Sequence, residues 1–411
     1  MSECPTHGLM PVDTAIDVLQ RAGRQKTPVI EEVSLIDALG RVLAEDIISS
    51  LDVPPQANSA MDGYALNTAD LHGEMIFTVS QRIAAGSQPS ALQQGTIARI
   101  FTGAVIPNGA NAVVMQEDCQ VLTDGRVKII ATVKDQENIR PQGQDIVFGQ
   151  QILQQGERLT VAAIGLLATI GQPTVRVYQR LKVVFFSTGD ELVEAGQSLA
   201  IGQIYNSNRS LIQSLLNEMG FIAIDGGVIA DNLPATLAAF KQAEQLADVI
   251  ISTGGVSVGE EDHVKAAIDQ CGELDLWKIA IKPGKPLAFG RIGDVPFIGL
   301  PGNPQSVWVT FLILARQFLL NRQGQRHKLL PDAIPIAADF AIHKSQKRRE
   351  YLRVRLNVSD AGLVLQRHHN QSSGVLSSAV WADGFAIVEI GKTVNEGDFL
   401  PFLSFSSLGV A

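Results

Sequence analysis

The sequence of 411 residues predicts a multidomain α/β protein built around a doubly wound α/β domain. Between Val177 and Arg322, apolar β-branched runs alternate with helix-forming segments, which is typical of a parallel sheet covered by helices on both faces. Strand-like runs separated by short turns dominate two other regions, from about Leu66 to Val147 and from about Leu330 to Ala411. The length favours roughly two to four domains, because one hydrophobic core rarely serves so long a chain.

Composition and charge exclude several classes of protein. The 45% hydrophobic and 18% charged content is typical of a globular protein, and the net charge of -9 argues against a general binder of nucleic acid or anionic membranes. The three cysteines are odd in number and far apart, so neither a disulfide framework nor a structural zinc site is expected. Without a leader-like N-terminus or an apolar run of about 18 residues, a cytoplasmic location is expected.

The N-terminal region is expected to be mainly helical. Between Pro11 and Ala44, apolar residues recur at helical spacing in VDTAIDVL and again in SLIDALGRVLAEDI, which predicts two helices. The prolines of LDVPPQANSAMDGYAL then force extended backbone, and Gly63 permits a turn. After the β region, GERLTVAAIGLLATIG returns to a helix with Thr160 as N-cap and Gly171 as its stop, so the β region is expected to be an insertion.

The α/β region places its loops where ligands usually bind. Strands are expected in LKVVFFSTG, FIAIDGGVIA and DVIISTGG, and helices in SNRSLIQSLLNEMG and PATLAAFKQAEQLA. A further helix is expected to begin at Asn303 and Pro304, because Asn is a favoured N-cap and Pro suits the first helical position. Ligands bind at the carboxyl ends of such strands, and those ends carry STGDEL, IADN, STGGVSVGEED and LPGNP.

These loops together indicate a site for a phosphorylated ligand and a divalent metal. Glycines let backbone approach a ligand, and a helix start attracts anions. Three lysines (Lys278, Lys282 and Lys285) lie in sequence between STGGVSVGEED and LPGNP. A run of carboxylates, Glu260 to Asp262, ends the first of these two loops. Each feature alone has a structural explanation, such as capping or a solvated face, so the functional interpretation rests on their convergence at one sheet edge.

Other candidates are more often structural when taken singly. Asp62, Thr102 and Asp145 each stand at a turn or strand end, and Arg348, Arg349 and Arg353 are explained by a solvated strand face. The sequence contains no HExxH zinc motif and no G-x-x-x-x-G-K-[ST] phosphate loop. No arrangement typical of nucleophilic catalysis is apparent either.

Seven motifs, in order along nearly the whole chain, resemble those of the MoeA family of molybdopterin molybdenumtransferases, whose relatives include the C-terminal domain of gephyrin. They are DVPPQANSAMDGYAL, IFTGAVIPNGANAVVMQED, RPQGQDI, FFSTGDEL, STGGVSVGEEDHVK, WKIAIKPGKPLAFG and GLPGNPQSVWVTF. The resemblance implies an elongated four-domain subunit that forms a homodimer. Its active site would lie between the α/β domain of one subunit and the inserted and N-terminal parts of the other.

The patterns and the resemblance together divide the chain into four domains. Residues 1–48 with 148–176 would form a discontinuous N-terminal mixed domain, and residues 49–147 an inserted small β domain. Residues 177–328 would form the α/β molybdopterin-binding domain, and residues 329–411 a C-terminal β domain.

The resemblance also implies a reaction, in which molybdate is inserted into adenylylated molybdopterin with Mg²⁺ as cofactor and AMP is released. Further partners would be the upstream adenylyltransferase and acceptor molybdoenzymes, with neither nucleic acid nor membrane involved. The residues that match family positions as catalytic groups are Glu191, Asp62, Asp145, Lys278 and Lys282. The substrate-binding residues expected from the loops and from the resemblance together are Thr102, Asp190, Asp231, Gly254, Gly255, Ser257, Asp262, Pro301, Gly302, Asn303, Arg353 and Ser373, of which Arg353 and Ser373 match the family more loosely. Metal ligands would be Glu191, Asp190 and Asp231.

Two alternatives remain open at the level of sequence. Loops similar to TGGVSVG and LPGNP occur in molybdopterin adenylyltransferases, although a protein limited to that step is expected to be about one domain long. A non-catalytic molybdopterin-binding scaffold is the second alternative, because of the relationship to gephyrin.

Overall fold

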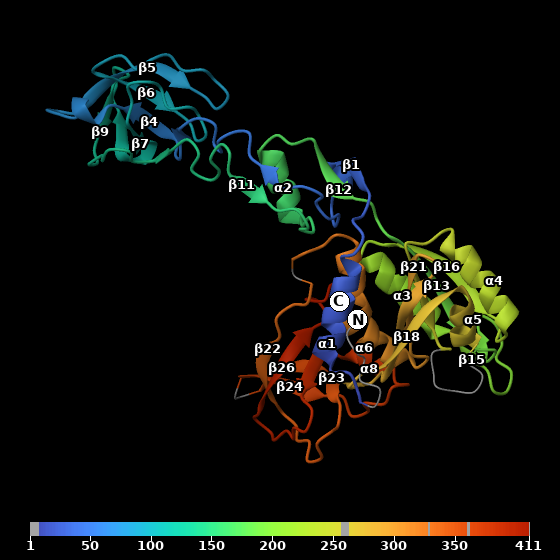
Figure 1. Cartoon of the computed structure of the whole chain (residues 1–411). Coiled ribbons are helices and arrows are strands. Elements are labelled where there is room, and N and C mark those ends of the chain that lie inside the picture. Colours follow the sequence, from blue (N-terminus) through green and yellow to red (C-terminus); the bar gives the residue numbers. More distant parts are fainter. Residues whose placement is uncertain (1–7, 256–262, 328, 360–361, 411) are drawn as a thin grey trace.

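The chain forms an elongated molecule (Figure 1). The structure is a computed structural model, and it describes residues 8–255, 263–327, 329–359 and 362–410. A small β lobe lies at one end, a narrow middle part follows, and an α/β domain and a C-terminal β domain lie side by side at the other end. No helix among these described ranges is long and apolar enough to cross a membrane.

A six-stranded sheet forms the centre of the α/β domain. Its strands, in spatial order, are β16 (Ile222–Ile229), β13 (Lys182–Thr188), β17 (Val249–Thr253), β21 (Val295–Leu300), β20 (Pro286–Ile292) and β18 (Gly272–Lys278). The first four strands are parallel, which confirms the predicted α/β class. The last two run antiparallel to their neighbours, so the sheet is mixed. The reason is connection length, because parallel neighbours need a crossover that the short links 279–285 and 293–294 cannot make.

Helices cover both faces of this sheet, as the alternating apolar pattern predicts. Successive residues of β13 point to opposite faces: Val183 and Phe185 belong to one core, and Val184 and Phe186 to another. The helices of this domain are α3 (Ser207–Glu218), α4 (Leu233–Glu244), α5 (His263–Cys271), α6 (Pro304–Thr310) and α7 (Arg316–Arg322). A π-helical turn, Phe311–Ala315, joins α6 to α7, and α1 (Val12–Gly23) packs against α7 in the first core.

The second N-terminal helix predicted from SLIDALGRVLAEDI is wrong. After β1 (Ile30–Ser34) there is a single 3-10 turn, Leu35–Asp37, and the chain then extends. Gly40 has a φ of 74°, which ends any helix, and Leu43 forms an antiparallel bridge with Val177. Pairing with distant strands therefore satisfies the apolar residues that periodicity alone assigned to a helix. The later helix is confirmed as α2 (Val161–Thr169), and the Thr160 side chain caps it.

The inserted β region contains a second six-stranded sheet. Its order is β7 (Ala112–Met115), β4 (Gly63–Leu66), β6 (Thr96–Ile100), β5 (Ile76–Ile83), β9 (Val127–Ile129) and β8 (Cys119–Val121). The chain enters and leaves this region along two antiparallel pairs, in which β2 (Ile47–Ile48) pairs with β11 (Gln151–Leu153) and β3 (Asn58–Ser59) pairs with β10 (Ile139–Arg140). The middle part consists of α2 and the pair of β1 with β12 (Thr174–Tyr178).

Gly63 does not form the turn that its position beside Asp62 predicted. It opens β4, and a Cβ atom there would lie 1.8 Å from the carbonyl oxygen of Val114 in β7. The glycine is therefore required by the close approach of two strands and not by a turn conformation.

The C-terminal domain is a small closed barrel with its own core. Its strands are β22 (Ile334–Ala338), β23 (Arg349–Ser359), β24 (Gly362–Arg367), β25 (Gly384–Val388) and β26 (Phe399–Ser404). The additional pairing of β23 with β25 closes the ring of strands. A two-residue strand of the α/β domain, β19 (Ile281–Lys282), pairs with β23 and joins the two domains beside the candidate site.

Candidate functional site

Two glycine-containing loops meet at the carboxyl edge of the α/β sheet. Gly254 follows β17 and Gly302 follows β21, and these two strands are neighbours in the sheet. A Cβ atom added at Gly302 would lie 3.8 Å from the Cα of Gly254. Gly254 has a φ of 86°, and a Cβ atom there would lie 2.8 Å from the hydroxyl of Thr188. Both backbone conformation and space therefore require glycine at residue 254.

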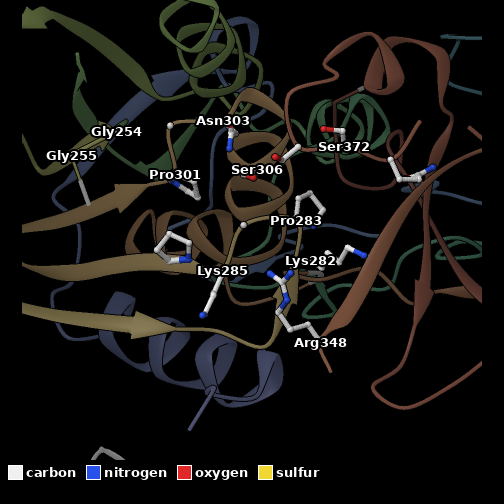
Figure 2. Close-up of a pocket in the computed structure, with 15 residues that line it drawn as sticks. Gly254, Gly255, Lys282, Pro283, Lys285, Pro301, Asn303, Ser306, Arg348 and Ser372 are labelled. Carbon is white, nitrogen blue, oxygen red and sulfur yellow. The ribbon is translucent and has the colours of Figure 1, made fainter. Parts of the chain in front are cut away.

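A cavity of about 420 Å³ opens between these loops and the C-terminal barrel (Figure 2). Its only charged lining residues in the described part of the chain are cations, namely Lys282, Lys285 and Arg348. The other residues that line it are Gly254, Gly255, Pro283, Gly284, Pro286, Pro301, Gly302, Asn303, Ser306, Gln371, Ser372 and Ser373. We call this the cationic cavity. The charge of this cavity is positive although the whole chain has a net charge of -9, as expected for a site that binds a small anion.

The three cations of this cavity differ in how far their charges are compensated. The Lys282 ammonium lies 2.5 Å from a carboxylate oxygen of Glu350, whose side chain is buried. The Arg348 guanidinium donates a hydrogen bond of 3.2 Å to the carbonyl of Ile281 but has no carboxylate partner among the described residues. Lys285 is exposed at the cavity and likewise lacks an acidic partner in the described ranges. The uncompensated positive charge therefore lies at Lys285 and Arg348.

A second cavity, of about 670 Å³, adjoins the first and carries carboxylates. Glu191 and Asp231 line it, and it shares Gly254, Gly255, Gly302 and Asn303 with the cationic cavity. We call it the carboxylate cavity. Asp190 does not line either cavity, but its carboxylate accepts a hydrogen bond of 3.2 Å from the backbone N–H of Asp231. A groove thus runs from cations to carboxylates across the two loops.

The carboxylate cavity offers two carboxylates, Glu191 and Asp231, to a divalent metal ion. Among the described residues, no group of three or more His, Cys, Asp or Glu side chains is arranged to hold a metal ion. Mg²⁺ usually takes only one or two protein carboxylates and completes its octahedron with water and substrate phosphates. Glu191 and Asp231 fit that donor set.

Arg353, predicted to bind substrate, lies beneath the cavity wall. It is 1% exposed and does not line the cavity. Its guanidinium donates to the Ser378 hydroxyl at 3.1 Å and to the Ser372 carbonyl at 3.3 Å. Burial lowers the pKa of Arg353 to about 10, so the side chain is cationic at neutral pH. Its contacts hold the loop that carries Ser372 and Ser373, and Ser373 lines the cavity.

Three further predicted residues are not found in the lining of either cavity. Lys278 is exposed at the end of β18 and lines neither cavity. Ser257 and Asp262 lie outside the described residues.

Asp62 directly precedes β4, Thr102 follows β6, and Asp145 lies between β10 and β11. Figure 1 shows β4 and β6 in the β lobe and β11 in the middle part, away from the α/β domain. The backbone N–H and the hydroxyl of Thr102 both donate to one Asp62 carboxylate oxygen, each at 2.8 Å. These two hydrogen bonds, the backbone one first, hold the pKa of Asp62 below its usual range. Asp145 is exposed, and its backbone N–H donates to the Val53 carbonyl. One chain therefore does not bring these three residues to the two cavities.

Sequence reasoning missed several residues of the cationic cavity. Arg348 was assigned to a solvated strand face, and Ser306, Gln371 and Ser372 were not singled out. KPGKP carried a usable signal, since Gly284 between Pro283 and Pro286 marks a fixed turn with a lysine at each side. Arg348 had no such signal, because only pairing of β19 with β23 brings it to the cavity.

Comparison with known proteins gives matches over most of the chain. Residues 10–171 match the family model of the MoeA N-terminal region (domain I and II). Residues 184–321 match that of a probable molybdopterin binding domain, and residues 336–405 that of the MoeA C-terminal region (domain IV).

Individual relatives agree with these matches. A molybdopterin molybdenumtransferase of Haemophilus influenzae is 38% identical over 381 residues, which cover 92% of this chain and 94% of that protein. A molybdopterin molybdenumtransferase of Nostoc sp. is 36% identical over 377 residues, which cover 88% of this chain and 86% of that protein. The crystal structure of a molybdopterin biosynthesis MoeA protein from Pyrococcus horikoshii superposes with a TM-score of 0.78 at 32% identity and covers 97% of this chain and 99% of that one.

Proposed function

The chain belongs to the MoeA family and acts in molybdenum cofactor biosynthesis, and from this premise we propose that it inserts molybdate into adenylylated molybdopterin with release of AMP. The observation that carries this proposal is the pair of adjoining cavities, one lined by cations and the other by carboxylates. A substrate with an oxyanion at one end and a metal-bridged phosphate linkage at the other matches that arrangement.

In this proposal the cationic cavity binds molybdate. Molybdate is a dianion, and Lys285 and Arg348 offer it charges that no described carboxylate compensates. Lys282 contributes less net charge because Glu350 already neutralises it. The hydroxyls of Ser306 and Ser372 add neutral donors around the same space. The cations keep molybdate next to the phosphorylated substrate, whose negative charge would otherwise repel it.

The carboxylate cavity is proposed to hold the linkage that breaks. Cleavage of the phosphoanhydride between AMP and molybdopterin places negative charge on phosphate oxygens. Glu191 and Asp231 would hold Mg²⁺, which supplies positive charge to those oxygens when bound. Asp190 orients the Asp231 loop through its backbone hydrogen bond. Gly254 and Gly302 let the backbone of these two loops approach the linkage closely.

We further propose that the active site is completed by a second subunit. Asp62, Thr102 and Asp145 match family positions, yet none of them lines either cavity of its own chain. The strands β4 and β6, next to Asp62 and Thr102, lie in the lobe at the other end of the molecule from the α/β domain (Figure 1). A two-fold symmetric dimer would bring the inserted β region of one subunit to the groove of the other. Exposed apolar side chains support such an interface, among them Phe148 beside that region and Ile204 in the lining of the carboxylate cavity.

The alternatives receive less support. The relatives named molybdopterin molybdenumtransferases match this chain along nearly their whole length, which favours the transferase over a one-domain adenylyltransferase. A non-catalytic scaffold does not account for the charges of the groove. A cytoplasmic location, and contact with an upstream adenylyltransferase and acceptor molybdoenzymes, are part of the proposal.

The test is a reconstitution with defined substrates. Purified protein is incubated with adenylylated molybdopterin, molybdate and Mg²⁺, and AMP release and activation of an apo-molybdoenzyme are both assayed. We expect both signals, and both should require molybdate. Substrate binding without AMP release would favour the scaffold, and ATP-dependent adenylylation of free molybdopterin would favour the adenylyltransferase.

A further inference from the structure

Two asparagines at the start of α3 line the carboxylate cavity and carry buried amide atoms without a hydrogen-bond partner among the described residues. Asn206 and Asn208 both line this cavity. Asn206 is 7% exposed, and its Nδ2 is buried without a hydrogen-bond partner among the described residues. The Oδ1 of Asn208 is likewise buried and has no partner in the described ranges. A buried donor and a buried acceptor two residues apart are costly unless something pairs with them.

The orientation of each amide is fixed by its other contacts. The Oδ1 of Asn206 accepts from the backbone N–H of Arg209 at 3.2 Å, as the N-cap of α3, and from the Ser187 hydroxyl at 3.1 Å. The Nδ2 of Asn208 donates to the Gly302 carbonyl at 2.7 Å. If the Asn206 amide were flipped, its NH₂ group would face the N–H of Arg209, and a flipped Asn208 amide would place its oxygen against the Gly302 carbonyl. The unpaired atom is therefore an N–H donor in Asn206 and an oxygen acceptor in Asn208.

We propose that Asn206 and Asn208 form a subsite for the hydrogen-bonding edge of a flat nitrogen heterocycle. The edge of such a ring carries both acceptors and donors, and these can pair with the free N–H of Asn206 and the free carbonyl oxygen of Asn208. The subsite rests on the proposed function, because adenylylated molybdopterin carries two rings of this chemistry, adenine and the pterin.

Neighbouring residues supply the rest of such a subsite. Tyr205, adjacent to Asn206, also lines the cavity, and its hydroxyl donates to the Gln197 carbonyl at 2.9 Å. That bond restrains the ring of Tyr205, which is 47% exposed and offers an aromatic side chain for stacking against a heterocycle. Glu191 and Asp231 line the same cavity, so a ring held there lies beside the proposed metal and phosphate position.

The decisive variant is Asn206→Asp. It keeps the oxygen that caps α3 and accepts from Ser187, and it replaces only the free N–H donor with an oxygen. The matched control is Asn217→Asp, which makes the same chemical change at an exposed position of the same helix. Thermal unfolding of both variants verifies that the fold is retained.

The probes are adenosine and a phosphate-free pterin, because both are uncharged and the added carboxylate does not repel them. Their binding to wild type, Asn206→Asp and Asn217→Asp is measured by ligand-observed NMR. We expect Asn206→Asp to weaken one ring by about tenfold, since a ring acceptor then faces an oxygen, while Asn217→Asp binds like wild type. If Asn206→Asp loses affinity for adenosine alone, the subsite binds adenine. If it loses affinity for the pterin alone, the subsite binds the pterin.

The inference is overturned if wild type binds neither ring, or if Asn206→Asp binds both rings as tightly as the control. The latter result means that water alone satisfies the two amides. The titration uses no molybdate and no turnover, so its failure is separate from failure of the reconstitution that tests the proposed function.

Discussion

At the scale of single residues, the uncompensated cations of the cationic cavity are the most direct targets. We expect Lys285→Ala and Arg348→Ala each to weaken molybdate binding by about tenfold or more, because each removes a charge that no described carboxylate offsets. Added salt should reduce the difference, since the cavity is open to solvent. Equilibrium dialysis with molybdate measures both effects. Lys241→Ala, on the surface of α4, is the control, and wild-type affinity in both cavity variants would contradict the assignment.

Substitution of Glu191 tests whether the carboxylate cavity holds a metal ion. Glu191→Gln should reduce AMP release by roughly a hundredfold, because the amide cannot supply the negative charge that a metal ligand needs. The side chain is exposed, so the midpoint of thermal unfolding should not change. Glu396→Gln on the C-terminal barrel serves as the control. If Glu191→Gln turns over like this control, Glu191 does not hold the metal.

The Asp62–Thr102 pair predicts a measurable pKa. Thr102→Val removes the hydroxyl donor but keeps the backbone donor, which is the larger cause of the lowered pKa. The pKa of Asp62 should therefore rise only part of the way to its usual value, as followed by carboxyl NMR. Because the folded pKa lies below the unfolded one, any stability from this carboxylate is present above the unfolded pKa. That stability is lost as the pH falls through the folded pKa. An unchanged pKa in Thr102→Val would contradict the hydrogen bond.

At the scale of secondary-structure elements, residue types that favour a helix start predicted where helices begin. Thr160 caps α2, and Asn303 with Pro304 opens α6, as their residue types predict. The segment from residue 35 to 44 shows the limit, because helical spacing of apolar residues there arises from pairing with strands more than a hundred residues away. Periodicity reports which residues are buried, and it does not report which partner buries them.

Gly63 gives a prediction for the inserted β region. Gly63→Ala places a methyl group against the backbone of β7, so β4 and β7 must separate at a cost of about 1–3 kcal/mol or more. Hydrogen exchange should accelerate in β4 and β7 and stay unchanged in the α/β domain, which has a separate core. Gly165→Ala is the control, because α2 has open space there and alanine favours a helix. Equal exchange in both variants would mean that the strands tolerate the methyl group.

At the scale of the whole molecule, the sequence predicted the edge of the sheet but not what faces it. Glu191, Asp231, Gly254 and Gly302 lie together because strand ends of one sheet must meet at one edge. Arg348 comes from the neighbouring barrel, and no periodicity within the chain reveals that contact. Asp62 and Thr102 also match family positions, but they stand beside β4 and β6, and these strands lie in the lobe at the other end of the subunit from the α/β domain (Figure 1).

That separation gives the sharpest test of the proposed two-subunit site. If the groove of one subunit uses Asp62 of the other, a hybrid of an Asp62→Asn chain and a Glu191→Gln chain has one intact site. A hybrid of a wild-type chain and a chain carrying both changes then has none, because each of its sites lacks one residue. If each chain uses its own Asp62, the two results are exchanged. Hybrids purified through two different affinity tags separate these cases.

We expect the hybrid of the two single variants to release AMP at about half the wild-type rate, because one of its two symmetric sites is intact. The hybrid of wild type with the double variant should be as inactive as either single-variant homodimer. Both hybrids have the same composition, so differences in folding or in total charge cannot produce the contrast. The opposite pattern would place the whole site within one chain and would require the inserted β region to swing toward its own α/β domain.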